Sequence, residues 1–449
     1  MNDKPTEPST NKNYIITNTQ YTNQTNASFA YFLLVIFTIL TLIRPQELPF
    51  FSSLSEIRPI AILTVIITTL TLLIRPFKWC TQHTLLFILV PFIAVSGALN
   101  GWAGKGIDQA LSILNSAFLP FLMFSLLLTT ARRQKLIMWI FIISSLLMVH
   151  NGHTQQNSFD RFGWAGVATV SDTRIRYVGI LQDPNDLGMV FMMTIPFVIY
   201  FFSESKAFGK LLHLIILGTL IYGIYMTNSR GTMLGLMGVT GLFLLLRYGN
   251  IKAIIAGLFS LPILLVIASS FRTISSEEDS ARGRLWAWWD GLEMLRANPI
   301  FGVGGGNFTE YHQRVAHNTY IQLIAELGSV GYLIWITMLF LTMIMGYQCV
   351  RKLRLAPVAE MNNKLRSELK LSATLFYSLT AFCLTAFFLS RDRFIIFYIV
   401  LGMAVAAYSR VVKANNDQPL FIVSKAVPRI MIGAIGVIIA IYIVLKLTL

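Results

Sequence analysis

Three arginines and one histidine are the side chains in this sequence best suited to chemistry on an anionic substrate. Arg230 lies in the short turn TNSRG, Arg282 and Arg284 open the run ARGRLWAWWDGLEML, and His317 precedes the apolar segment that begins near residue 319. A planar guanidinium can bond two phosphate oxygens at once. A neutral imidazole can accept a proton as a general base. These residue types suit the transfer of a group away from a pyrophosphate.

Each of these positions also has a purely structural explanation. Arg230 could anchor a helical hairpin by snorkelling to the membrane interface. Arg282 and Arg284 could belong to an amphipathic helix that lies on the membrane surface, with its tryptophans at headgroup depth. His317 could be an ordinary interfacial histidine. If it stands at a helix start, however, the helix dipole disfavours its cationic form, and this favours a base.

Other polar residues gather in the same parts of the chain. Arg176 and Asp183 lie in SDTRIRYVGILQDPNDLG, where DPND indicates a turn with Asp186 near a helix start. Glu326 lies inside an apolar segment, where a carboxylate needs a partner or a wet cavity. We therefore treat His317, Arg284 and Arg230 as candidate catalytic residues, and we add five candidate substrate-binding residues: Arg282, Arg176, Asp183, Asn318 and Glu326.

A glycine cluster separates the arginines from the histidine. Asn298-Pro299 is expected to end the amphipathic helix, and Gly302 to Gly306 contain four glycines in five residues. A nucleotide-binding loop is not supported, because no strand–helix unit surrounds the cluster and no Lys-Ser/Thr follows it. We expect a hinge or a loop that approaches its neighbour closely, and we expect Gly328 and Gly331 to permit close helix packing.

The rest of the chain must position these residues in a membrane. Of 449 residues, 55% are apolar and 13% are charged, against about 25% charged residues in ordinary globular chains. The apolar residues fall into runs long enough to cross a bilayer as helices. We predict an all-α polytopic bundle of about 12–13 spans, with thirteen candidate segments at 28–43, 59–74, 84–99, 107–130, 136–149, 186–203, 211–227, 232–246, 253–270, 319–345, 371–390, 393–409 and 428–447.

The distribution of Lys and Arg predicts the orientation of the bundle. With a cytoplasmic N-terminus, 21 of the 36 Lys and Arg residues fall on the cytoplasmic side, against seven in the short connections opposite. Residues 1–27 then form a disordered cytoplasmic tail, and residues 28–449 form one transmembrane catalytic domain. The long loops, at about 150–185 and 271–318, face the periplasm together with the turn that contains Arg230.

Several kinds of site are not predicted. The sequence contains no HExxH motif, no CxxC pair and no P-loop, so we expect neither a metal site nor a cofactor. Its three cysteines imply no disulfide framework. The net charge of +15 fits cytoplasmic anchoring to membrane lipids better than binding to nucleic acid.

The segment HNTYIQLIAELGSVG resembles the large-loop signature of the bacterial O-antigen ligase family, which also includes O-antigen polymerases and protein O-oligosaccharyltransferases. The preceding GRLWAWWDGLEMLRANPIFGVGGGNF looks like the external loop of that family, and TNSRG looks like its arginine turn. QDPNDLG is similar to a segment frequent in the ligase-like members. The resemblance covers about residues 178–335.

The resemblance implies a helical, metal-independent, C-type glycosyltransferase in the bacterial inner membrane, with its active site at the periplasmic face. Such enzymes take a glycan from undecaprenyl-pyrophosphate and, in the ligase branch, move it to lipid A-core or another glycan acceptor in lipopolysaccharide biosynthesis. By the same resemblance, Arg230 and Arg284 would neutralise the pyrophosphate and His317 would activate the acceptor hydroxyl. Attack opposite the leaving group would invert the anomeric centre.

Two other functions stay open at the level of sequence. A repeat-unit polymerase would use the same donor with a growing glycan as acceptor. A transporter of the lipid-linked glycan belongs to a different class, and it would place charged residues along a path through the bundle and often show internal repeats. In this sequence the distinctive polar residues gather at one face, which favours an enzyme.

Overall fold

Apolar helices make up nearly all of the fold. The computed structural model describes residues 11–51, 59–73, 79–171, 173–248, 275–355 and 361–448. Within these residues no strand forms, and two isolated bridges pair Phe162 with Ala168 and Val170 with Arg174. Helices satisfy their backbone hydrogen bonds within one segment, which a bilayer requires. The predicted all-α polytopic membrane fold is confirmed.

The described elements follow one another along the chain in this order. They are α1 (Asn11–Leu42), η1 (Pro45–Glu47), α2 (Pro59–Leu73), α3 (Thr81–Leu99), α4 (Ala103–Ile113), η3 (Leu114–Phe118), α5 (Leu119–Leu127), α6 (Ala131–Asn157), η4 (Gly179–Leu181), α7 (Pro184–Glu204), α8 (Ala207–Thr227), α9 (Arg230–Tyr248), α11 (Ser275–Ala297), α12 (Phe308–Tyr311), α13 (Thr319–Leu355), α14 (Asn363–Thr385), α15 (Ile395–Ala414) and α16 (Val423–Thr448).

Ten of the described helices are long and apolar enough to cross a membrane. One of the ten is the continuous unit α4–η3–α5, and α2 is a shorter apolar helix of 15 residues. The buried helix α14 is not among the ten, because charged residues occupy its first two turns. The predicted segment 253–270 lies outside the described residues. The other twelve predicted segments overlap helices of the structure.

Two helices extend beyond the apolar runs that predicted them. α1 begins at Asn11, within the segment 1–27 for which the sequence predicts a disordered tail. α6 continues to Asn157, well past the predicted end at residue 149. Its polar last turns hold the following loop: the Asn151 Oδ1 accepts a hydrogen bond from the Ala165 N–H at 2.8 Å, and the Gln155 Nε2 donates to the Val167 carbonyl at 2.8 Å. Hydropathy alone misses such a helical extension.

α14 ends earlier than predicted. The segment 371–390 was expected to be helical throughout, but α14 stops at Thr385 and residues 386–394 form a non-helical turn before α15. This turn, which we call the α14–α15 turn, contains Ser390-Arg391-Asp392-Arg393. The turn contacts several helix starts, and its backbone groups bond to them instead of extending the helix.

α13 is kinked at Gly328. At the kink, backbone groups of α13 form hydrogen bonds with the glycine cluster and the residues just before it. Gly328 has φ +63° inside the helix. The Ala325 carbonyl accepts from the Val303 N–H at 3.0 Å, and the Glu326 carbonyl accepts from the Gly304 N–H at 2.9 Å. In return, the Ser329 N–H donates to the Pro299 carbonyl at 2.9 Å. The kink therefore leaves these backbone groups paired, as burial requires.

The exchange depends on two glycines in close contact. A Cβ atom on Gly302 would lie 2.4 Å from the Gly328 nitrogen, and a Cβ atom on Gly328 would lie 2.4 Å from the Ile300 carbonyl oxygen. Gly302 has φ +67°, a left-handed backbone conformation that residues other than glycine rarely adopt. The prediction of a close-approach loop is confirmed. Gly331 packs against Phe92 of α3, as expected for close helix packing.

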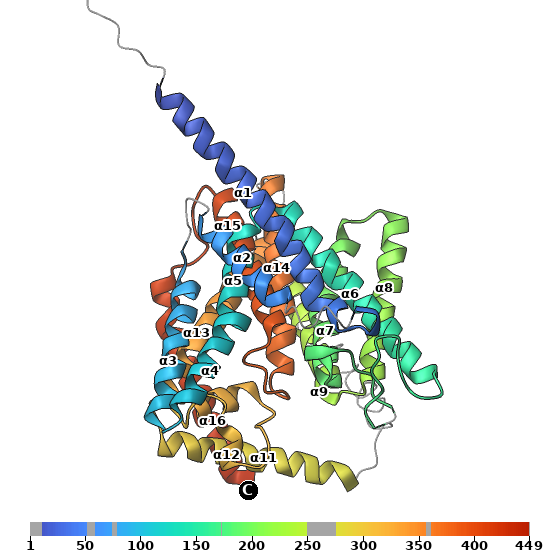
Figure 1. Cartoon of the computed structure of the whole chain (residues 1–449), viewed down its shortest axis with the longest axis vertical. Coiled ribbons are helices and arrows are strands. Elements are labelled where there is room, and N and C mark those ends of the chain that lie inside the picture. Colours follow the sequence, from blue (N-terminus) through green and yellow to red (C-terminus); the bar gives the residue numbers. More distant parts are fainter. Residues whose placement is uncertain are drawn as a thin grey trace, which may run out of the picture.

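α11 lies across the end of the bundle opposite the start of α1 (Figure 1). Its buried Leu292 belongs to an apolar cluster that includes Ile321 of α13 and Leu445 of α16. The Trp289 ring stacks on Tyr442 of α16, with centroids 6.1 Å apart. The predicted amphipathic helix is therefore present, and Leu292 and Trp289 on its apolar side pack against α13 and α16.

Replacing Gly328 by alanine is expected to destabilise the protein. The new Cβ would meet backbone atoms in a left-handed conformation, a strain that costs on the order of 1–3 kcal/mol. The matched control is Gly283→Ala in α11, where a Cβ meets no atom within 4 Å. Thermal unfolding of both variants in detergent checks this: Gly328→Ala should lower Tm and Gly283→Ala should not. Equal Tm values would show that the kink tolerates a side chain.

Candidate functional site

Three helices begin at one end of the bundle, each with a polar cap. The Asp183 carboxylate accepts from the Asn185 N–H at 2.8 Å and caps α7. The Ser229 hydroxyl accepts from the Thr232 N–H at 3.3 Å at the start of α9. The Asn318 Oδ1 accepts from the N–H groups of the first turn of α13 at 3.0 and 3.2 Å. Helix starts carry partial positive charge and favour anions.

The α14–α15 turn brings these three helix starts together. The Thr319 N–H donates to the Ala386 carbonyl at 2.9 Å, and the Thr319 hydroxyl donates to the Leu389 carbonyl at 2.6 Å. At the start of α9, a Cβ atom on Gly231 would lie 2.8 Å from the Phe388 Cβ. The turn therefore touches both α13 and α9.

Arg391 of the same turn fixes the start of α7. Its Nε and Nη2 atoms donate to the two carboxylate oxygens of Asp186 at 2.5 and 2.6 Å. Its Nη2 atom also lies 3.6 Å from Asp183 Oδ2. The backbone N–H of Arg391 donates to the Thr319 hydroxyl at 3.0 Å. The Asp186 side chain is only 3% exposed, so this bidentate pair replaces the water that a buried carboxylate loses.

His317 lies next to this assembly, immediately before α13. It is half-buried and has φ +48°. Burial lowers its pKa below 6.5, and the positive charges of Arg284, Arg391 and Arg314 lower it further, while Asp183 opposes them. The imidazole is therefore mainly neutral at neutral pH, which is the state that a general base requires.

Arg284 reaches His317 from α11. The Trp288 indole donates to the Ala316 carbonyl at 3.0 Å, and this bond ties α11 to the residue that precedes His317. Arg284 is half-buried, four residues before Trp288. The structure thus places two predicted residues, Arg284 and His317, within electrostatic reach of each other.

Arg230 occupies the neighbouring helix start. It is the first residue of α9 and is half-buried. Gly231 beside it packs on the α14–α15 turn, and Thr232 packs on Gly188 of α7, where a Cβ would lie 2.5 Å from the Thr232 Oγ1. Arg230 is therefore at the same end of the bundle as His317, next to the glycine that packs on the α14–α15 turn.

The five predicted substrate-binding residues have different environments. Asp183 and Asn318 are helix caps at the site, and the Asn318 Nδ2 has no partner among the described residues although the side chain is fully buried. The Arg176 Nε donates to the Ala168 carbonyl at 2.6 Å, within the loop that follows α6. The side chain of Arg282 lies outside the part of the chain that the structure describes.

Glu326 holds the glycine cluster. Its carboxylate accepts from the Gly306 N–H at 2.7 Å and from the Gln322 Nε2 at 2.6 Å, and it lies 3.4 Å from the Arg393 guanidinium. The side chain is 3% exposed. These protein donors supply the partners that an intramembrane carboxylate needs, and the substrate-binding role expected from the sequence stays a prediction.

Sequence reasoning missed Arg391 and Arg174. The Arg174 Nε donates to the Thr227 carbonyl at 3.1 Å and its Nη2 donates to the Asn185 side chain at 2.9 Å, so it joins the end of α8 to the start of α7. The signal for Arg391 was the run of charges in SRDR between two apolar segments. Charges so close to the hydrocarbon need partners.

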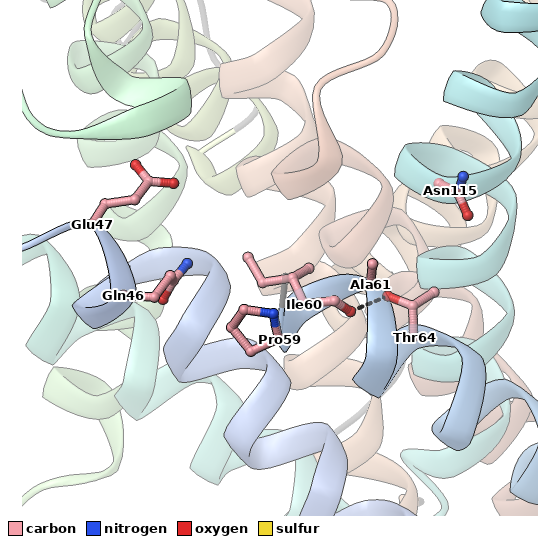
Figure 2. Close-up of a pocket in the computed structure, with 7 residues that line it drawn as sticks. All are labelled: Gln46, Glu47, Pro59, Ile60, Ala61, Thr64 and Asn115. Carbon is pink, nitrogen blue, oxygen red and sulfur yellow. Dashed lines mark hydrogen bonds between the residues drawn. The ribbon is translucent and has the colours of Figure 1, made fainter. Parts of the chain in front are cut away.

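A separate cavity of about 330 Å³ lies between η1, the start of α2 and η3 (Figure 2). Its lining residues are Gln46, Glu47, Pro59, Ile60, Ala61, Thr64 and Asn115. It contains none of the residues around His317, and we do not assign it to the site. Among the described residues, no three His, Cys, Asp or Glu side chains are grouped as metal ligands would be, so we identify no residues that could hold a metal ion.

Removing the Asp186 charge is expected to loosen the site. Asp186→Asn leaves Arg391 without its bidentate carboxylate, and breaking a buried pair costs roughly 3–5 kcal/mol. We expect a loss of about 3 kcal/mol, at the lower end of this range, because the Arg391 side chain is 31% exposed to solvent. The control Glu293→Gln breaks an exposed pair with Arg296 and should cost less than about 1 kcal/mol. Thermal unfolding in detergent compares them, and equal losses would contradict a structural role for the Arg391 pair.

Part of the chain matches a known protein family. Residues 215–336 match the family model described as O-Antigen ligase. The match runs from α8 into α13 and contains Arg230, Arg284 and His317, while Asp186 and Arg391 lie outside it. No curated protein matches the chain. This multi-pass membrane protein thus has an O-antigen ligase domain at residues 215–336, which supports its membership of the O-antigen ligase superfamily.

Proposed function

We propose that the protein is an O-antigen ligase-type glycosyltransferase of the bacterial inner membrane. It would move a glycan from undecaprenyl-pyrophosphate to a surface acceptor such as lipid A-core. One observation carries the proposal: a half-buried histidine with a lowered pKa lies beside Arg284 where three helix starts meet. The O-antigen ligase match over residues 215–336 supports the same class of reaction.

The orientation that we propose places this site at the periplasmic face. α7, α9 and α13 begin at the site, whereas α8 and α14 end there, so the connections between these helices fall at one end. The Lys- and Arg-rich end of α13, within residues 351–355, and the Lys- and Arg-rich start of α14, within residues 363–370, belong to the opposite end. A cytoplasmic N-terminus and an external site follow from the excess of positive charge at that other end.

In the proposed mechanism, the diphosphate binds where cationic groups and helix starts face it. Arg284 and Arg230 would contact its oxygens, assisted by the partial positive charge of the first turns of α9 and α13. Negative charge grows on the pyrophosphate as the glycosidic bond breaks, so fixed cations stabilise the transition state more than the bound donor. No metal ion or cofactor is part of the proposal.

His317 would act as the base. As the acceptor hydroxyl oxygen bonds to the anomeric carbon, its proton passes to an imidazole nitrogen of His317. The bond between the anomeric carbon and the pyrophosphate oxygen breaks, and its electron pair stays on the pyrophosphate. Attack from the face opposite the leaving group inverts the anomeric configuration. A repeat-unit polymerase would use the same donor and residues with a growing glycan as acceptor, so the acceptor decides between the two.

Removing the base or the arginine is expected to abolish glycan transfer. Loss of a general base typically costs 10²–10⁴-fold in rate, and loss of one electrostatic donor costs about 10²–10³-fold. We expect such losses for His317→Ala and Arg284→Gln, with retained activity for Arg296→Gln, because Arg296 is an exposed arginine on the same helix. The measurement is the mass of the product formed by purified protein from a defined lipid-linked donor with lipid A-core or free glycan as acceptor.

Three outcomes would change the proposal. Transfer by folded His317→Ala protein at the normal rate removes the base assignment. Transfer to a growing glycan but not to lipid A-core moves the protein to the polymerase branch. An unchanged anomeric configuration in the product rejects direct displacement.

We expect the pH dependence of glycan transfer to change when a charged residue that takes no part in the reaction is replaced. The positive charge of Arg314, an exposed residue, lowers the pKa of His317. Arg314→Gln therefore raises that pKa, and the acid limb of kcat/KM moves to higher pH because more imidazole is protonated at a given pH. Arg296→Gln serves as the control and should leave the limb in place. A limb that stays fixed, or moves to lower pH, in Arg314→Gln contradicts the role of a neutral His317.

A further inference from the structure

A large cavity lies at the end of the bundle opposite His317. It has a volume of about 840 Å³ and is lined by α7, α8, α9 and the ends of α13 and α14 that point away from the site. This volume is in the upper part of the range of roughly 300–1,000 Å³ that holds small ligands. No residue that we place in glycan transfer lines it.

The walls of the cavity are apolar, and the geometry of α8 and α9 accounts for the space. The two helices are joined by a tight turn at the site end, where Asn228 has φ +47°. Away from that turn, Ile221 of α8 and Leu244 of α9 line the cavity between them. Gly241 of α9 also lines it, and a Cβ atom at this position would meet no atom within 4 Å. None of the residues that the structure describes fills this space.

The mouth of the cavity is cationic. Arg247, Arg354, Arg366 and Lys370 line it together. Lys370 pairs with Glu204 at 2.6 Å. The other three cations form no ion pair with any acid in the described ranges. They belong to the ends of α9 and α13 and the start of α14, the end of the bundle at which the excess of Lys and Arg predicts the cytoplasm.

We infer that this cavity binds one anionic phospholipid of the cytoplasmic leaflet. Its acyl chains would occupy the apolar space between α8 and α9, and its phosphate would lie at Arg247, Arg354 and Arg366. Basic pockets between membrane helices on the cytoplasmic side are suited to anionic lipid head groups. A zwitterionic lipid has a compensating positive charge and is bound less well. The polyprenyl donor would present its diphosphate at the opposite end, beside Arg284.

Native mass spectrometry of the full chain in detergent tests this. The probes are a palmitoyl-oleoyl phosphatidylglycerol and the phosphatidylcholine with the same chains, each titrated separately. We expect one phosphatidylglycerol to bind saturably at least tenfold more tightly than phosphatidylcholine. A diazirine-labelled phosphatidylglycerol should crosslink to peptides of α8 and α9, which tests the location without any substitution.

Two variants test the contribution of the cationic residues to lipid binding separately from that of the apolar space. The double variant Arg247→Gln/Arg366→Gln should weaken phosphatidylglycerol binding roughly 30-fold, because each cation near an anionic lipid contributes to binding. Gly241→Leu fills open space and should abolish binding of the single tight lipid. The matched control is Gly218→Leu in α8, an exposed glycine that also has open space around it and lies outside the cavity lining, and it should bind as the native chain does.

Equal binding of the two lipids overturns the proposal, as does binding that Gly241→Leu leaves unchanged or crosslinks that avoid α8 and α9. It is also overturned if undecaprenyl phosphate binds there and phosphatidylglycerol does not displace it. Glycan transfer, measured on the same preparations, reports on the other end of the bundle. Loss of lipid selectivity with intact transfer, or intact selectivity without transfer, therefore distinguishes this inference from the proposed function.

Discussion

The α14–α15 turn is the constraint on which the rest of the site depends. Through Thr319 it holds the start of α13, and through the Arg391–Asp186 pair it holds the start of α7. Phe388 of the same turn lies against the start of α9. Helix starts repel one another electrostatically because each carries partial positive charge. The carboxylates of Asp183 and Asp186 offset this repulsion while the guanidinium between them keeps the two acids from repelling each other.

The protonation state of His317 follows from the same electrostatics. Burial and the cations around it lower its pKa, and Asp183 is the one acid that opposes them. Cationic surroundings would therefore have two uses in the proposed mechanism: they favour the uncharged imidazole, and they would attract the diphosphate of the donor. Both depend on α11 staying beside α13. The Trp288 bond to Ala316 and the exchange of backbone hydrogen bonds between the glycine cluster and the Gly328 kink hold those two elements in place.

Much of this could be predicted from the sequence, because the relevant signals are local. Apolar runs predicted the bundle, Pro299 predicted the end of α11, and four glycines predicted a close approach. The partner of the glycine cluster could not be predicted, since the contacts at the Gly328 kink join residues that are 22 to 30 positions apart in the sequence, such as Val303 with Ala325 and Pro299 with Ser329. Arg391 was missed because its partner, Asp186, is 205 positions away. The hydrogen bond from the Gly306 N–H to Glu326 could not be predicted for the same reason, because the two residues are 20 positions apart.

The most direct test is the position of a bound diphosphate. Electron cryomicroscopy of the protein with undecaprenyl pyrophosphate would show whether the diphosphate lies at the starts of α9 and α13. We expect its oxygens within hydrogen-bonding distance of Arg284 and Arg230, with the His317 imidazole facing the position of the transferred sugar. A diphosphate bound at the opposite end, beside Arg247 and Arg366, would contradict the account.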